Sequence, residues 1–114
     1  MNILYKSENL NGREIYAMTQ NGAGEKLSDN NGLKMDIVGY VIYLDDSYDN
    51  ASERAVMMCD IGTGVPKLVG TNSQPTVRAL KNLISLCPTL PIKDVVITSK
   101  PSNNGRTYFT LTLE

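Results

Sequence analysis

The clearest pattern of hydrophobic and polar positions in this chain lies just before residue 87. Apolar residues recur there at three- and four-residue spacing, as is typical of an amphipathic helix: Val77, Leu80, Leu83 and Ile84. Residues 71–73 carry side chains that can cap a helix, and Pro75 suits a first turn. Cys87 precedes a proline, which disfavours helical geometry. The pattern predicts a helix from Gln74 or Pro75 to Leu86.

β-branched and aromatic residues dominate five other segments, which predicts five strands. Their ranges are 33–44, 54–61, 65–70, 92–100 and 106–113. Gly39 lies inside the first range, and a glycine within a strand often marks a bulge that curves the sheet. Residues 45–52 form a polar, acidic loop, and residues 101–105 contain Asn-Gly, a strong hairpin signal. The first three strands are therefore expected to form a meander and the last two a hairpin.

A second, shorter helix is predicted within residues 9–20, with Asn9 or Asn11 as its cap and glycines after it. The chain order is thus one helix, three strands, one helix and two strands. A helix between the third and fourth of five strands matches the OB-fold. We therefore expect a mainly β protein with two helices, namely a five-stranded OB-like barrel with a short N-terminal helix. An α+β sheet covered by two helices stays open as the alternative.

Length and composition predict one soluble domain over residues 1–114. No apolar run approaches the roughly 20 residues of a membrane span, and no secretory signal is evident, so we expect a cytoplasmic protein without membrane contact. Cys59 and Cys87 form no closely spaced metal motif and are expected to be buried free thiols without a redox role.

The charges are unevenly distributed along the chain, although the formal net charge is only −1. Residues 1–65 carry five basic and ten acidic residues, whereas residues 66–114 carry six basic and two acidic ones. A local basic patch governs contact with phosphates more than the total charge does. The excess of basic residues in the C-terminal half indicates an anionic partner, and an ordinary solvated surface is the alternative interpretation.

Three short motifs resemble the small single-stranded-DNA-binding proteins of tailed-phage replication modules: Asp60 to Gly64, Thr71 to Ser73, and Gly105 to Tyr108. The resemblance covers roughly residues 34–113. It implies an OB-like barrel that binds single strands without sequence preference, encoded by a phage or related mobile element and working in the cytoplasm of a bacterial host cell.

Binding of an unpaired strand requires aromatic faces for the bases and cations for the phosphates. Tyr108 is predicted to project from the polar face of the last strand, next to Arg106 and across the hairpin from Lys100. Tyr40 and Tyr43 fall on opposite faces of the first strand, and either is a candidate for the outward ring. A half-buried packing role is the usual alternative for a strand tyrosine.

Further basic residues lie in or beside strands and are candidates for tracking the phosphate backbone: Lys34, Arg54, Lys67 and Lys93. Lysines at strand edges also serve to deter edge-to-edge aggregation, so this second interpretation stands beside the first.

Catalysis has little support, because the chain contains no histidine and neither cysteine has an activating partner nearby in sequence. The acidic cluster of Asp45, Asp46 and Asp49 lacks the spacing of an EF-hand, and residues 62–64 lack the lysine of a P-loop. We expect no enzyme, no metal site and no cofactor.

The sequence therefore predicts a single-stranded-DNA-binding protein of phage replication or recombination, with a homodimer and phage replication proteins as possible further partners. The alternative function is a small phage protein that binds a host or replication protein through a strand edge or a helix face.

Overall fold

The structure is a computed structural model that describes residues 2–20, 23–45 and 52–114. Its elements follow the chain in this order: β1 (Asn2–Lys6), α1 (Gly12–Thr19), β2 (Glu25–Lys26), the 3₁₀ helix η1 (Leu27–Asn30), β3 (Lys34–Asp45), β4 (Ser52–Asp60), β5 (Lys67–Thr71), α2 (Gln74–Leu86), β6 (Ile92–Pro101) and β7 (Thr107–Leu113). The mainly β character with two helices is confirmed.

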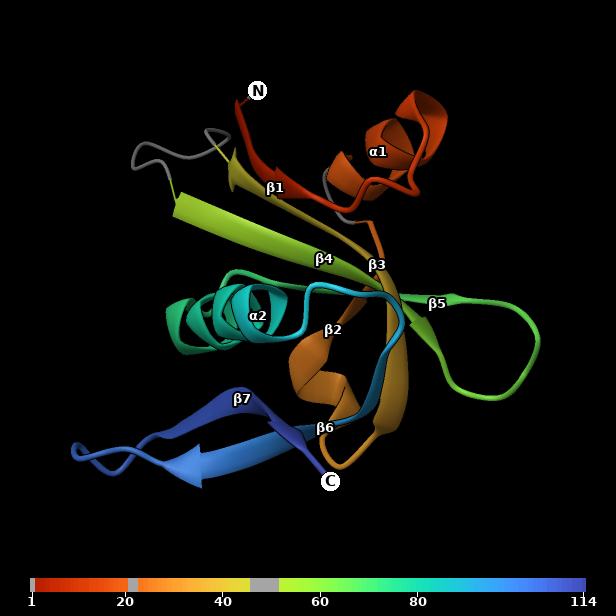
Figure 1. Cartoon of the computed structure of the whole chain (residues 1–114). Coiled ribbons are helices and arrows are strands. Elements are labelled where there is room, and N and C mark those ends of the chain that lie inside the picture. Colours follow the sequence, from red (N-terminus) through yellow and green to blue (C-terminus); the bar gives the residue numbers. More distant parts are fainter. Residues whose placement is uncertain (1, 21–22, 46–51) are drawn as a thin grey trace.

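All strands belong to one curled sheet with the order β2-β5-β4-β3-β6-β7, and β1 pairs separately with β3. All pairs are antiparallel except β2 with β5, which is parallel. β1 and β6 bond to different halves of β3: β1 pairs with residues 41–44, and β6 with residues 34–37. In Figure 1, β6 and β7 curve away below α2, while β1 and β4 lie above it.

The bend predicted at Gly39 is confirmed. The register of β3 against β4 shifts between Ile37 and Gly39, as expected for a β-bulge. A Cβ atom at position 39 would lie 3.1 Å from Cδ2 of Leu10, so glycine also lets the segment before α1 approach the strand closely. The bulge therefore curves the sheet and seats α1 on its outer face.

The finer prediction, a five-stranded OB-like barrel, is not confirmed. The sheet has seven strands, and among the described residues β5 and β7 do not pair. Glu25 and Lys26 bond instead along an edge of β5, opposite Val69 and Gly70. Beside β7, the Thr76 hydroxyl of α2 donates to the Phe109 carbonyl at 2.6 Å. A short strand and a helix thus occupy the gap where closure would occur.

Two hydrophobic clusters lie on opposite faces of the sheet. The larger one packs α2, through Val77, Leu80 and Leu83, against β3, β4, β6 and β7. The smaller one joins Leu10 and Met18 to Val41, Tyr43 and Val56 on the other face. β3 and β4 are buried from both sides, which explains why β3 reads as a nearly continuous apolar run.

The two helices begin as local sequence chemistry predicts. Asn11 accepts from the Glu14 N–H at 2.9 Å and Glu14 bonds back to the Asn11 N–H at 3.0 Å, which completes a capping box. α2 begins after Ser73 and ends at Leu86, which confirms the predicted range. Neither of these helices is long and apolar enough to cross a membrane.

Candidate nucleic-acid interface

The β6–β7 hairpin brings three of the predicted site residues together. Lys100 lies directly opposite Tyr108 in the antiparallel register, and Arg106 stands two residues before Tyr108. The turn is held by Ser102, whose N–H and hydroxyl both donate to the Arg106 carbonyl, at 2.7 and 2.8 Å. Gly105 supplies the positive φ of 79° that the turn requires. The predicted juxtaposition of Lys100, Arg106 and Tyr108 is therefore present.

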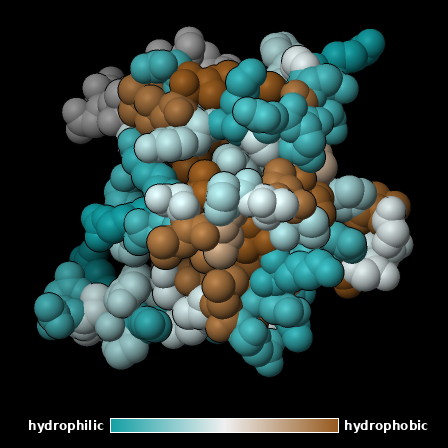
Figure 2. All heavy atoms as spheres, in the orientation of Figure 1, coloured by the Kyte–Doolittle hydropathy of each residue, from teal (hydrophilic) through white to brown (hydrophobic). Residues whose placement is uncertain are grey.

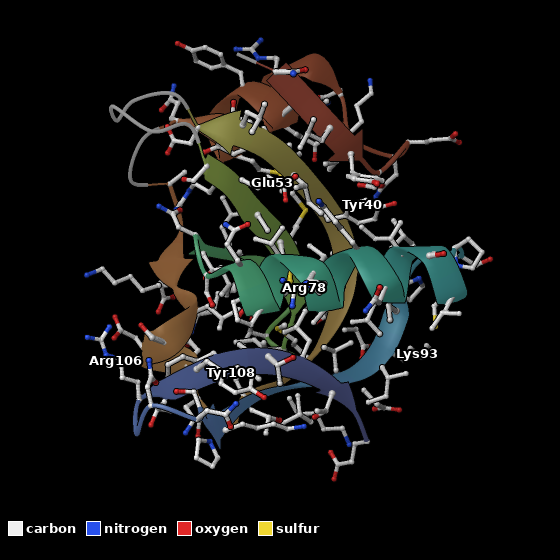
Figure 3. All side chains as sticks on the ribbon, turned by 90° about the vertical axis from the view of Figure 1, so that its left-hand side faces the viewer. Tyr40, Glu53, Arg78, Lys93, Arg106 and Tyr108 are labelled. Atoms are coloured by element: carbon white, nitrogen blue, oxygen red, sulfur yellow. The ribbon has the colours of Figure 1, made fainter. Side chains whose placement is uncertain are left out.

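These three side chains are available to a partner. Lys100 and Arg106 are exposed, Tyr108 is half-buried, and none of them has a side-chain hydrogen bond or ion pair with another described residue. Figure 3 shows Arg106 and Tyr108 along β7, with α2 between them and Tyr40. In Figure 2 the projecting hairpin at the lower left is hydrophilic. We call Lys100, Arg106 and Tyr108 the hairpin cluster.

Lys34 is on β3, beside the end of β6 and β7 that lies opposite the hairpin turn, and it forms ion pairs with two acids. Its ammonium group is 3.5 Å from both Asp94 and Glu114. Glu114 and then Asp94 raise the pKa of Lys34. Asp94 and Lys100 are six residues apart on β6, or about 20 Å along a strand. The acids therefore do not neutralise the hairpin cluster, but Lys34 is not a free cation as the sequence suggested.

Lys67 is also committed to partners within the fold. Its ammonium group donates to Asn30 Oδ1 at 2.8 Å and lies 3.2 Å from Glu25. Its side chain is only 23% exposed. Lys67 thus holds β2 and η1 against β5, and this contact offers no free charge for a phosphate.

Tyr43 is not the outward ring that stacking would require. Its side chain is 3% exposed and packs in the cluster beneath α1, because both faces of β3 are covered. Burial raises the pKa of Tyr43, which keeps its phenol neutral. Tyr40 is the more exposed of the pair, but it packs against the main core and borders a hollow beside Pro88 and Leu90.

Arg54 lies away from the hairpin cluster, at a second possible site that the sequence did not indicate. Its guanidinium donates to Asn72 Oδ1 at 2.7 Å and to the Ala23 carbonyl at 3.4 Å. It lines a cavity of about 470 Å³ together with residues from η1, β5 and β7. Phe109 is far from residues 24–28 in the chain, so no local sequence pattern links it to them.

No metal centre is evident in the described part of the chain, where no three Cys, Asp or Glu side chains are grouped to hold an ion. Asp46 and Asp49 of the predicted acidic cluster lie outside the described residues.

Comparisons of the chain with models of protein families, with curated proteins and with solved structures find no match.

The Cys59 thiol is fully buried in the main core, and burial raises its pKa to about 12. The pKa of a cysteine in an unfolded chain is about 8.5, so Cys59 stabilises the fold fully below that pH and loses this contribution as the pH rises toward 12.

In a Cys87→Ala variant at pH 8, Cys59 is expected to react with a disulfide reagent at least about 100-fold more slowly when folded than in urea. Equal rates would place the thiol outside the core.

Proposed function

We propose that this protein binds single-stranded DNA without sequence preference, in the replication or recombination of a phage or mobile element. The hairpin cluster carries the proposal: one ring and two cations lie side by side on the β6–β7 hairpin, and none of these side chains has a hydrogen bond or ion pair with another described residue. A ring in this setting supports base stacking, and cations beside it meet the phosphates on either side of the base. Neither contact depends on base identity, so tolerance of sequence follows.

The curled, open sheet supports this proposal because its β3-β4-β5 meander, α2 and β6–β7 hairpin follow one another in the chain order of an OB-fold. OB-folds bind oligonucleotides on the face of their second and third strands and on two loops. Here the outer face of β4 is covered by the segment that contains α1, since Val56 is 0% exposed and packs with Leu10 and Met18. The binding surface is therefore assigned to the hairpin rather than to that face.

The wild-type protein is expected to bind a fluorescently labelled oligothymidine, with an affinity that falls as salt rises. If Lys100 and Arg106 each neutralise one phosphate, a plot of log K against log [salt] has a slope of about −1.4 for a single strand. Fluorescence anisotropy at several salt concentrations measures this slope. Absence of binding at low salt would contradict the proposal and favour protein binding instead.

One observation favours that second function. β1 pairs only with β3 among the described strands, which leaves its other edge open to a further strand. Its Ile3, Leu4 and Tyr5 are all exposed, and Figure 2 shows a hydrophobic patch over β1 at the top of the molecule. An exposed apolar edge is a template for pairing with another chain. A second copy of β1 in antiparallel register at this edge would give the homodimer, and sedimentation of the pure protein tests for it.

A further inference from the structure

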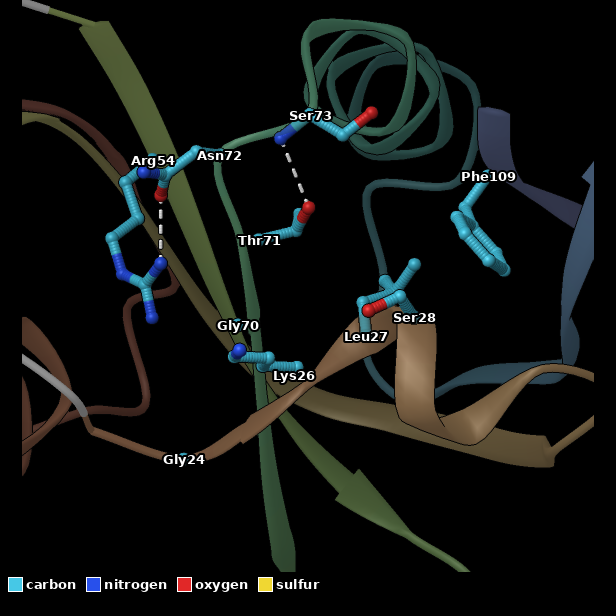
Figure 4. Close-up of a pocket in the computed structure, with 10 residues that line it drawn as sticks. All are labelled: Gly24, Lys26, Leu27, Ser28, Arg54, Gly70, Thr71, Asn72, Ser73 and Phe109. Atoms are coloured by element: carbon cyan, nitrogen blue, oxygen red, sulfur yellow. Dashed lines mark hydrogen bonds between the residues drawn. The ribbon is translucent and has the colours of Figure 1, made fainter. Parts of the chain in front are cut away.

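The cavity beside Arg54 lies where the sheet fails to close. The end of β5 and the segment that leads into α2 form one wall through residues 70–73, η1 contributes Leu27 and Ser28, and β7 contributes Phe109. Figure 4 shows Arg54 on one side of the opening and Phe109 on the other. Phe109 and Tyr108 alternate along β7, so the cavity and the hairpin cluster use opposite faces of that strand.

The lining of this cavity is more apolar than polar in area, and its charged groups are basic. It includes Arg54 and Lys26, the side chains of Ser28, Thr71, Asn72 and Ser73, and no acidic residue among those described. A mainly apolar cavity with a few placed polar groups is the common form of a ligand pocket. This one is half open to solvent, and its volume of about 470 Å³ is within the usual range of about 300–1,000 Å³. The lining therefore suits an anionic organic molecule.

Arg54 is the charged group that such a ligand would meet. The guanidinium donates to two neutral acceptors and interacts with the Tyr43 hydroxyl, and no carboxylate of the described residues lies within ion-pair distance of it. Its Nε is buried without a hydrogen-bond partner. A partly buried arginine without a counter-charge is costly, and arginine is well suited to bind phosphate. Gly70 preserves the space for it, since a Cβ there would lie 2.6 Å from a guanidinium nitrogen.

The start of α2 adds to the positive potential at this wall. The first turn of α2 contains no acidic residue, and Ser73 makes no side-chain capping bond. The free backbone N–H groups at a helix start favour an anion nearby. This feature reinforces the charge of Arg54 and does not define the site alone.

We propose that the cavity binds one nucleoside monophosphate unit, with its phosphate at Arg54 and its base against the Phe109 ring. The unit is either a free nucleotide or one nucleotide of a longer strand, since both present the same chemistry. The site is argued from its own lining and does not rest on DNA binding by the hairpin cluster.

Titration of the ¹⁵N-labelled protein with thymidine 5′-monophosphate, followed by NMR, tests the site. Backbone amides of residues 26–28 and 70–73 are expected to shift. Arg54→Gln should weaken the affinity at least about 10-fold, as expected for loss of one charge-assisted contact. Ser28→Trp, which fills the cavity from an exposed position on η1, should do the same without touching the core. Arg78→Gln, on the exposed face of α2, is the matched control and should bind normally.

The outcomes distinguish a free nucleotide from one nucleotide of a strand, and binding in the cavity from binding at the hairpin cluster. Oligothymidine that shifts the same amides identifies a strand unit, whereas shifts with the mononucleotide alone identify a free nucleotide. Tyr108→Ala should leave mononucleotide binding unchanged, so failure of the hairpin proposal would not affect this result. Unaltered affinity in folded Arg54→Gln and Ser28→Trp would overturn the cavity proposal. Equal affinity for inorganic phosphate and for the mononucleotide would overturn the role of Phe109.

Discussion

Replacing Tyr108 with alanine is expected to weaken oligothymidine binding by about 5- to 150-fold, because stacking of one base on an aromatic ring contributes about 1–3 kcal/mol. The ring is half-buried and is not part of the main core, so its loss leaves no cavity there. Arg106→Ala and Lys100→Ala should each weaken binding and make the salt slope shallower by about 0.7. Fluorescence anisotropy measures both quantities.

Two matched controls separate a local contact from a general loss of aromatic or basic surface. Tyr16→Ala removes a tyrosine that is 66% exposed on α1, far from the hairpin in sequence. Lys93→Ala removes an exposed lysine from the other end of β6. Both should bind oligothymidine as the wild type does. Unchanged affinity in Tyr108→Ala and Arg106→Ala, with folding intact by circular dichroism, would show that the strand binds elsewhere.

Leu80→Ala is expected to lower the free energy of unfolding by about 2–5 kcal/mol, the usual cost of removing a buried leucine. Leu80 is 0% exposed at the centre of the face that α2 turns toward the sheet. Small domains are stable by only about 5–15 kcal/mol, so the variant would lose much of its stability. The midpoint of urea denaturation measures the change.

Leu86→Ala on the same helix is the control for this effect. Leu86 is 80% exposed at the last position of α2, so its truncation should change the stability by no more than about 0.5 kcal/mol. A loss for Leu80→Ala as small as that for Leu86→Ala would show that α2 does not seal the open side of the sheet.

The hairpin cluster was predictable because its geometry is local. An Asn-Gly turn between two β-rich segments brings neighbouring strands together, and alternation then places Tyr108 beside Arg106 and opposite Lys100. The bulge at Gly39, the α2 boundaries and the Asn11 cap were predictable for the same reason, since each depends on a few adjacent residues.

The contacts of the other predicted site residues depend on segments far apart in the chain. Lys67 bonds to Asn30, which lies 37 positions away, and Arg54 bonds to Asn72, the residue that follows β5. A periodic pattern shows that a side chain is polar or that a strand is buried, but it does not show which distant group will satisfy a charge. Sequence analysis therefore predicted a phosphate contact for both Lys67 and Lys100, although Lys67 instead bonds to Asn30 and Glu25 within the fold.

The sequence alone determined the helices, the five principal strands and the pairing within the hairpin, because hydrophobic periodicity and turn chemistry act over a few residues. Tertiary structure alone decided that α1 covers the outer face of β3 and β4 and buries Tyr43, and that β2 and α2 stand where β5 and β7 would meet. Those outcomes depend on which of several apolar faces pack together. That choice is made by contacts between segments far apart in the chain, which no local pattern records.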